Sequence, residues 1–214
     1  MNNIERRNKE MAYISDEAIF KEQLVCRKIL QELNFMDRSD FEGISKVTRE
    51  LLDAPQGAFI NPPFYCDYGK RIHVGKIFSA YYKCTVLDVA DVTIGDSCEL
   101  APNVAIYTAG HPVHPDTRNS GYEYGKKVTI GNNVWIGGNV VICPGVSIGN
   151  NVVIGAGSVV TRDIPDWSIA VGNPCKVHKK ISEADRRKFY KDEDIDEEAW
   201  KDMIKRGYAG VEEV

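Results

Sequence analysis

The chain has 214 residues, with 27 lysine and arginine residues against 31 aspartate and glutamate residues, and a formal net charge of −4. This length suits one domain with appendages, and the weakly acidic balance argues against a nucleic-acid-binding surface. No apolar run reaches transmembrane length, and the first residues lack the apolar core of a signal peptide. The six cysteines include no CxxC pair, which is typical of reduced, buried cysteines, so we expect a cytoplasmic protein.

Residues 1–57 are predicted to form a helical cap. Ser15 is a candidate N-cap for a first helix, because the acidic Asp16 and Glu17 follow in its first turn. Apolar residues then recur at helical spacing: Ala18, Val25, Ile29 and Leu33. A second helix is predicted to begin at Ser39, with Glu42 completing a capping box.

Short strands are predicted from residue 58 onward. Apolar residues recur at a six-residue step, with one two-residue slip, at Val74, Ala80, Val86, Ile94, Leu100 and Ile106. Residues 107–127 then interrupt this pattern, and a long insertion in a regular repeat is often functional.

Residues 128–160 contain the most regular repeat in the chain. Isoleucine recurs every six residues from Ile130 to Ile154, and valine recurs two residues earlier in each unit. Residues two apart in a strand point to the same side, so each Val-x-Ile pair should be buried at roughly 1.5–3 kcal/mol per side chain. The corner residues are glycine or asparagine, which favours positive φ at Asn133, Asn139, Gly145, Asn151 and Gly157.

Three such sides would close a triangular coil, so the repeat predicts a parallel solenoid with about eighteen residues per coil. A sandwich of short strands is the alternative, but its strands would be longer and less evenly spaced.

A charged helical tail is predicted for residues 181–214. Ser182, with Asp185 three residues on, is a candidate helix start, and a further helix is expected from Asp196 to Arg206 with Gly207 as its stop. The chain therefore divides into a cap (1–57), a β-helix (58–180) and the tail (181–214).

His111 is the candidate general base. It precedes a proline in the insertion, which restricts its backbone, and Glu123 in the same loop could fix the tautomer of its imidazole. Imidazole ordinarily titrates near pH 6.5, which suits a base at neutral pH. Such a base could take the proton of a substrate hydroxyl.

Several longer motifs identify a resemblance: DYGKRIHVG, LDVADVTIGDSCELAPNV, YTAGHPVHPDTRNSGYEYGKKVTIGNNVWIGG and GNPCKV. Over residues 8–182 the chain closely resembles the hexapeptide-repeat sugar O-acetyltransferases, the maltose, galactoside and nodulation-factor enzymes. The resemblance implies a left-handed parallel β-helix and transfer of acetyl from acetyl-CoA to a sugar hydroxyl, without a metal or a covalent intermediate. It also implies a homotrimer with active sites between subunits, and His111 as the base.

The resemblance assigns further roles position by position. Asp16, Asp67 and Asp88 match positions that line the acceptor pocket, whereas Tyr81 stands where the family usually has asparagine. Trp135 matches the tryptophan that packs on the pantetheine arm of the coenzyme. The other positions that touch coenzyme A are matched by Gly138, Ala156, Thr161, Arg162, Lys176 and Lys179, of which Arg162, Lys176 and Lys179 would bind its phosphates.

Three other readings stay open. The same fold could act on a non-sugar acceptor, an antibiotic or serine. A zinc lyase of the carbonic-anhydrase type would need three imidazoles around one metal. The histidine positions count against it, because His111 and His114 lie in the loop while His73 is two coils away. A non-catalytic solenoid scaffold is the last alternative. No nucleic-acid or membrane partner is expected.

Overall fold

The structure is a computed structural model that describes residues 1–55 and 57–208. It separates into two compact units, Met1–Lys179 and Lys180–Val214. The last six positions of the predicted tail, 209–214, lie outside the described residues. No helix within 1–55 and 57–208 combines the length and the apolar character needed to cross a bilayer.

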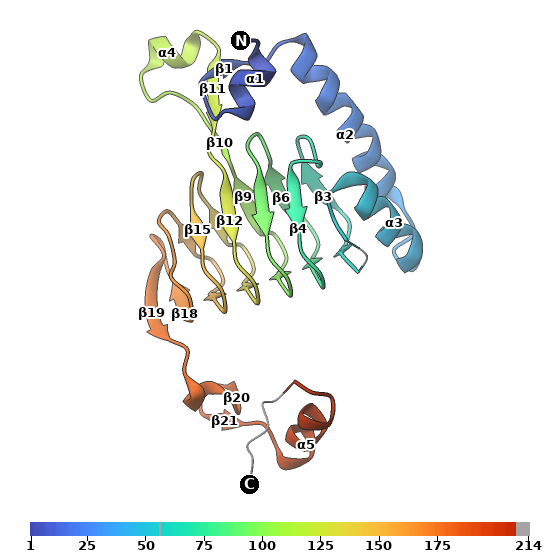
Figure 1. Ribbon diagram of the computed structural model, residues 1–214, viewed down its shortest axis with the longest axis vertical. Helices are drawn as coiled ribbons and strands as arrows, with labels where there is room; N and C mark the ends of the chain where they lie inside the picture. The colour runs from blue at the N-terminus through green and yellow to red at the C-terminus, as the bar shows by residue number, and fades with distance from the viewer. Residues whose placement is uncertain (56, 209–214) are drawn as a thin grey trace. The chain divides into compact units, whose positions relative to one another are not determined.

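The first unit is a parallel β-solenoid of about six turns with three faces (Figure 1). Face 1 consists of β4 (Ile72–Val74), β7 (Val92–Ile94), β12 (Val128–Ile130) and β15 (Ser147–Ile148). Face 2 consists of β2 (Phe59–Ile60), β5 (Ser79–Ala80), β8 (Glu99–Leu100), β13 (Trp135–Ile136), β16 (Val153–Ile154), β18 (Ser168–Val171) and β19 (Lys176–Lys180). Face 3 consists of β3 (Phe64–Cys66), β6 (Cys84–Leu87), β9 (Ala105–Tyr107), β14 (Val141–Ile142) and β17 (Val159–Val160).

The predicted inward columns are confirmed. In β12, Val128 and Ile130 are buried while Thr129 between them is exposed, and Ile130 pairs with Ile94 on one side and Ile148 on the other. Stacked corner residues such as Asn133 and Asn151 lie 18 positions apart, as the repeat predicts. All five predicted corner residues have positive φ, between 56° and 81°.

The two-residue slip in the repeat corresponds to a wider corner in the early coils of the solenoid. Equivalent residues of the early coils, such as Tyr68 and Asp88, are 20 positions apart instead of 18. The extra residues widen the corner where the chain passes from face 3 to face 1. Asp67 follows β3 directly and Asp88 follows β6 directly, so both carboxylates lie at this wider corner.

The helical cap is confirmed, but both predicted N-caps are off by one residue. Helix α2 (Glu17–Phe35) begins at Asp16, whose carboxylate accepts the N–H groups of Ala18 and Ile19. Helix α3 (Phe41–Leu51) begins at Asp40, which accepts the N–H of Gly43. In each case the adjacent serine hydroxyl, that of Ser15 or Ser39, donates to a different carboxylate.

The buried face of α2 includes Leu33 as predicted but is otherwise shifted by one residue. The side chains that pack inward are Ile19, Cys26, Leu30 and Leu33. Val25, predicted to face inward, is 63% exposed. The helix is longer and less strictly amphipathic than a pattern of four apolar positions assumes. Together with α3 it covers the first coil of the solenoid (Figure 1).

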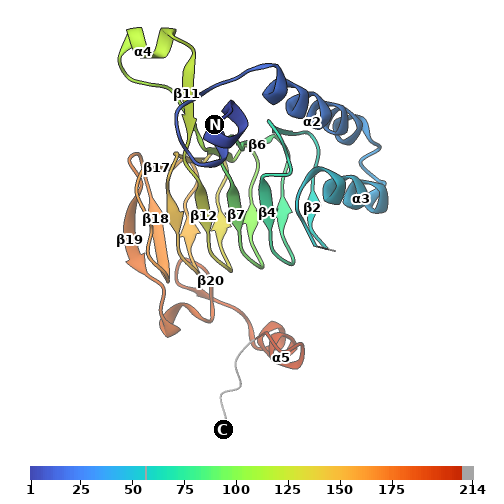
Figure 2. The ribbon, with the colours of Figure 1, turned by 45° about the horizontal axis from the view of Figure 1, so that its top comes forward.

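A small sheet made of two strands of the insertion and one N-terminal strand was not predicted. Strand β11 (Tyr122–Gly125) pairs antiparallel with β10 (Ala109–Gly110) and with β1 (Tyr13–Ile14). Helix α1 (Asn3–Asn8) precedes β1, and the short α4 (Pro115–Asn119) lies between β10 and β11. The N-terminal segment therefore lies beside the insertion at one corner of the solenoid (Figure 2).

The second unit has a small core of its own. Helix α5 (Glu197–Lys205), capped by Asp196, confirms the predicted last helix, and Gly207 follows it at φ 79°. The ring of Trp200 is buried under the Arg187 guanidinium, 5.0 Å from its centroid. The helix predicted at Ser182 is wrong, because only a 3₁₀ turn (Glu183–Asp185) forms before β20 (Lys188–Tyr190) pairs with β21 (Glu193–Asp194).

Candidate active site

The predicted site residues fall into two groups in the first unit. The first group, which we call the corner cluster, lies where the chain leaves face 3 or in the segments beside that corner: Asp16, Asp67, Asp88, His111, Glu123, Thr161 and Arg162. The second group, which we call the face-2 set, lies along face 2 and the turns that follow its strands: Tyr81, Trp135, Gly138, Ala156, Lys176 and Lys179.

Asp88 is the most buried acid of the corner cluster. Its Oδ1 accepts the backbone N–H groups of Asp67 at 2.8 Å and Tyr68 at 3.0 Å. Its Oδ2 is also buried but has no hydrogen-bond partner among the described residues. Burial raises the pKa of this carboxyl, although the backbone N–H groups oppose the shift. An unpaired buried oxygen is costly, so it is available to accept a hydroxyl of a ligand.

Asp67 is half-buried beside Asp88. Burial, with the neighbouring carboxylates of Asp88 and Glu123 adding to it, raises the pKa of Asp67 from 3.8 to about 6. The positive charge of Arg27 acts in the opposite direction. A raised pKa in a group of converging acids is typical of a functional site.

Asp67 should therefore make the protein less stable as the pH rises. Between its ordinary value of 3.8 and about 6, the folded chain holds a proton that the unfolded chain has released. The stability contributed by this proton is lost as the pH rises through 6, with a slope of at most about 1.4 kcal/mol per pH unit. Asp67→Asn should remove this slope in denaturant titrations from pH 4 to 7. Asp37→Asn is the control. Hydrogen bonds from Ser39 lower the pKa of Asp37, so the stability that Asp37 contributes is lost as the pH falls, and its replacement should leave the Asp67 slope in place.

His111 is exposed and comes directly after β10. Its imidazole has no hydrogen bond to another residue in the described part of the chain, so its ring nitrogens are accessible to a ligand. The last paired residues of β10 and β11 are Gly110 and Tyr124. Continuing the same antiparallel register by one residue on each strand makes His111 and Glu123 the next opposed pair. The Glu123 carboxylate, however, accepts the hydroxyl of Ser15 at 2.5 Å.

The segment from α1 to α2 holds this corner in place. Tyr13 is fully buried, and burial together with the facing Glu123 carboxylate raises the pKa of its hydroxyl. Asn3 donates to Asp16 at 3.0 Å and accepts the N–H of Ile14 at 3.2 Å. The bond from Asn3 and the bonds from the start of α2 lower the pKa of Asp16, so this acid has a structural role as an N-cap.

Thr108 belongs to the same corner and was missed by the sequence analysis. It is fully buried, donates its hydroxyl to the carbonyl of Leu87 at 2.6 Å, and accepts the N–H of Ala90 at 2.9 Å. It directly follows β9, as Asp67 and Asp88 follow β3 and β6. Reading the residue after each face-3 strand would have found it.

Two members of the face-2 set, Tyr81 and Trp135, line a cavity of about 420 Å³. Its aromatic walls are Tyr81, Tyr82 and Trp135, which are 43%, 44% and 55% exposed, and the two tyrosine rings meet edge to face with centroids 5.9 Å apart. Glu99, whose backbone pairs with Trp135, also lines it. This volume lies within the usual range for small-molecule pockets. Neither Tyr82 nor Glu99 was singled out from the sequence.

The remaining predicted coenzyme positions are exposed or half-exposed. Gly138 and Ala156 occupy equivalent turns of successive coils, and a Cβ on Gly138 would lie 3.3 Å from the carbonyl oxygen of Pro102. Lys176 and Lys179 lie on β19 at the end of face 2. Thr161 and Arg162 instead follow β17, so they lie on the same corner as Asp67 but four strands of face 3 away from it.

One chain does not bring the two groups together. Tyr81 precedes β6 and Asp88 follows it, so they lie at opposite ends of one solenoid side, separated by the whole strand, about 13 Å at 3.3 Å per residue. Within residues 1–55 and 57–208, no three His, Cys, Asp or Glu side chains are arranged to hold a metal ion.

Comparisons with known proteins agree with this architecture. Residues 127–162 match the family model described as bacterial transferase hexapeptide (six repeats). The galactoside O-acetyltransferase of Escherichia coli (strain K12) is 41% identical over 177 residues, which cover 82% of this chain and 87% of that protein. A galactoside acetyltransferase solved in complex with coenzyme A has a TM-score of 0.88 and 39% identity, covering 92% of this chain and 99% of that one. A maltose O-acetyltransferase from Clostridium difficile 630 has a TM-score of 0.80 and 48% identity, covering 86% and 99%.

Proposed function

The chain belongs to the hexapeptide-repeat sugar O-acetyltransferases, and on that premise we propose that it moves the acetyl group of acetyl-CoA to a hydroxyl of a sugar or glycoside. The enzyme class, an acetyl-CoA-dependent acyltransferase, follows from the family. The sugar acceptor, the catalytic base and the direct transfer are our proposal. We assign the acceptor site and the catalytic base to the solenoid and its helical cap. We expect the enzyme to work in the cytoplasm, where its free cysteines stay reduced.

The observation that carries the proposal is an exposed, unpaired imidazole beside converging acids. His111 lies next to Glu123 in the register of the insertion, and Asp67 and Asp88 lie at the corner from which that insertion starts. A sugar presents several hydroxyls, and carboxylate oxygens are good directional acceptors for them. The unpartnered Oδ2 of Asp88 and the carboxyl of Asp67 suit this role.

The reaction needs one base and no covalent enzyme intermediate. His111 takes the proton of the acceptor hydroxyl while that oxygen attacks the carbonyl carbon of the thioester. The tetrahedral intermediate then collapses, the C–S bond breaks, and the protonated imidazole gives its proton to the departing sulfur. Positioned proton transfer of this kind contributes typically about 10²–10⁴-fold.

The coenzyme would bind against the face-2 set. The Trp135 ring offers an exposed apolar surface for the pantetheine arm, and Gly138 and Ala156 allow close approach of the backbone. Arg162, Lys176 and Lys179 are the cations proposed for its phosphates, since cationic donors recognise phosphate strongly. Tyr81, in place of the family's asparagine, would face the acetyl end, and its hydroxyl can still donate a hydrogen bond.

The separation of the two groups within one chain supports a homotrimer in which each active site combines the corner cluster of one subunit with the face-2 set of the next. The proposal predicts complementation between His111→Ala and Trp135→Ala, each inactive alone. In trimers assembled at random from equal amounts, about a quarter of the interfaces carry both intact residues. Co-expressed variants should therefore recover about a quarter of the wild-type rate. A mixture no more active than its separate components would contradict a shared site.

The activity itself is tested by thiol release from acetyl-CoA with a panel of acceptors. We expect turnover with at least one of maltose, glucose or a galactoside, and acetylated sugar as the product by mass spectrometry. Serine and several aminoglycoside antibiotics belong in the same panel. Strong turnover of one of these, with no response to any sugar, would support the non-sugar acceptor instead.

A further inference from the structure

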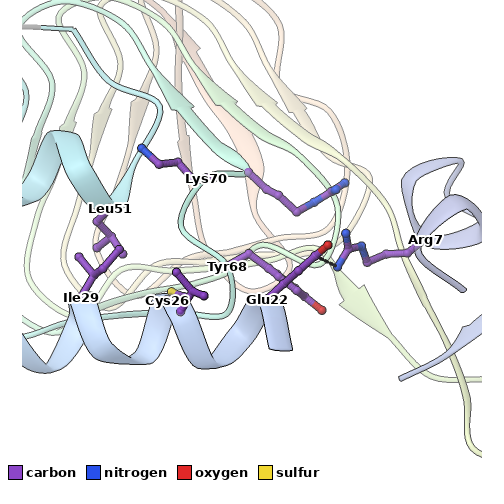
Figure 3. Close-up of a pocket in the computed structure, with 9 residues that line it drawn as sticks. Arg7, Glu22, Cys26, Ile29, Leu51, Tyr68 and Lys70 are labelled. Atoms are coloured by element: carbon purple, nitrogen blue, oxygen red, sulfur yellow. Dashed lines mark hydrogen bonds and ion pairs between the residues drawn. The ribbon is translucent and has the colours of Figure 1, made fainter. Parts of the chain in front are cut away.

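A second cavity lies between the helical cap and the solenoid, and it is lined by none of the residues of the corner cluster or the face-2 set. It has a volume of about 300 Å³, which is the share of about ten waters in the liquid. Helices α2 and α3 form one side, and the turn that follows β3 forms the other (Figure 3). Ile29, Cys26 and Leu51 lie on the helical side, and Lys70 and Tyr68 lie opposite.

The helical wall is aliphatic. Cys26 and Leu51 are buried, Ile29 is half-buried, and Val25 lines the same cavity although it is 63% exposed. Val25 and Ile29 are one turn apart on α2 and therefore form a continuous apolar strip. Such a strip facing a cavity is unfavourable in water and favours the hydrocarbon part of a ligand.

The rest of the lining carries an excess of positive charge. Arg7 pairs with Glu22 at 2.8 Å and Arg71 pairs with Asp91 at 3.0 Å. Lys70 has no carboxylate within ion-pair distance in the described part of the chain and donates instead to the carbonyls of Leu52 at 2.9 Å and Arg49 at 3.3 Å. Three cations against two carboxylates leave the cluster with one unbalanced positive charge.

Arg71 also contains an unsatisfied donor. Its Nη1 donates to Asn8 at 2.8 Å and its Nη2 pairs with Asp91, but its Nε is buried and has no partner among the described residues. A buried donor without an acceptor is rare and calls for an explanation. A carboxylate is the group that a guanidinium edge accommodates best.

We propose that this cavity binds a monocarboxylate with a medium-length aliphatic chain. Its carboxylate would lie beside the guanidinium of Arg71 and the ammonium of Lys70, and its chain would cover Val25 and Ile29. The ligand is neither the acceptor nor the coenzyme of the acetyl transfer, so the proposal goes beyond that function and stands or falls separately.

The test is calorimetric titration of the full chain, saturated with coenzyme A, with octanoate below its micellar concentration. We expect one site per chain, with 1-octanol binding at least tenfold more weakly and octylammonium more weakly still. Binding of octanol as tight as that of octanoate, or no binding of octanoate at all, would overturn the proposal.

Two variants locate the site. Arg71→Met should weaken octanoate binding at least tenfold, whereas Arg38→Met, a matched loss of one exposed arginine, should leave it unchanged. Ile29→Trp should fill the cavity and abolish binding even if Arg71→Met folds poorly, and circular dichroism reports folding in each case. Wild-type affinity in a folded Ile29→Trp protein would place the ligand elsewhere and refute the assignment.

Discussion

Replacing His111 by alanine should lower acetyl transfer by about 10²–10⁴-fold, the range typical of a lost general base. Coenzyme A should still bind with unchanged affinity, because the proposed coenzyme contacts lie in other segments. The hydroxyl of a sugar is a weak nucleophile until its proton is removed. The measurement is the steady-state rate of thiol release together with a calorimetric titration of coenzyme A.

His114→Ala is the matched control for this variant. His114 lies in the same insertion, is exposed, and accepts the N–H of Asp116 at 3.3 Å as the N-cap of α4. Its loss should cost the short helix its cap and leave the rate within a few-fold of wild type. Equal losses for the two variants would mean that the insertion as a whole matters, and that His111 is not the base.

The repeat made most of the fold predictable, because one physical requirement recurs in every coil. Each coil must bury two residues per side and turn a tight corner, so the Val-x-Ile pairs and the Asn or Gly corners report the structure locally. The cap was less predictable at the level of single residues. Asp16 replaces Ser15 as N-cap because the Ser15 hydroxyl bonds Glu123, 108 positions away in the chain.

The candidate site was predictable by residue type but not by arrangement. His111 and Asp88 stood out through the insertion and the family motifs. That Asp88 has an orphaned oxygen, and that Asp67 is held near it, depends on the widened corner and the segment that contains Tyr13. That Tyr81 and Asp88 lie at opposite ends of one solenoid side could be seen only once the strands were assigned to faces.

Ile130→Ala should destabilise the fold by about 2–5 kcal/mol, the usual cost of truncating a buried isoleucine. Ile130 is 1% exposed and stacks between Ile94 and Ile148. It therefore lies in the coil that joins the repeats before the insertion to those after it. In a solenoid each coil contacts only its neighbours, so a cavity here weakens the connection between two halves of the molecule.

Thr129→Ala separates this effect from a general disturbance of β12. Thr129 is the outward-facing neighbour of Ile130 in the same strand, and its truncation should change stability by no more than about 0.5 kcal/mol. Urea unfolding at one fixed protein concentration measures both variants, since any oligomer makes stability concentration-dependent. If Ile130→Ala cost no more than Thr129→Ala, the inward columns would contribute little, and the backbone ladders between coils would have to hold the solenoid together. Because an isolated ladder bond contributes only about 1 kcal/mol net, we expect the columns to dominate.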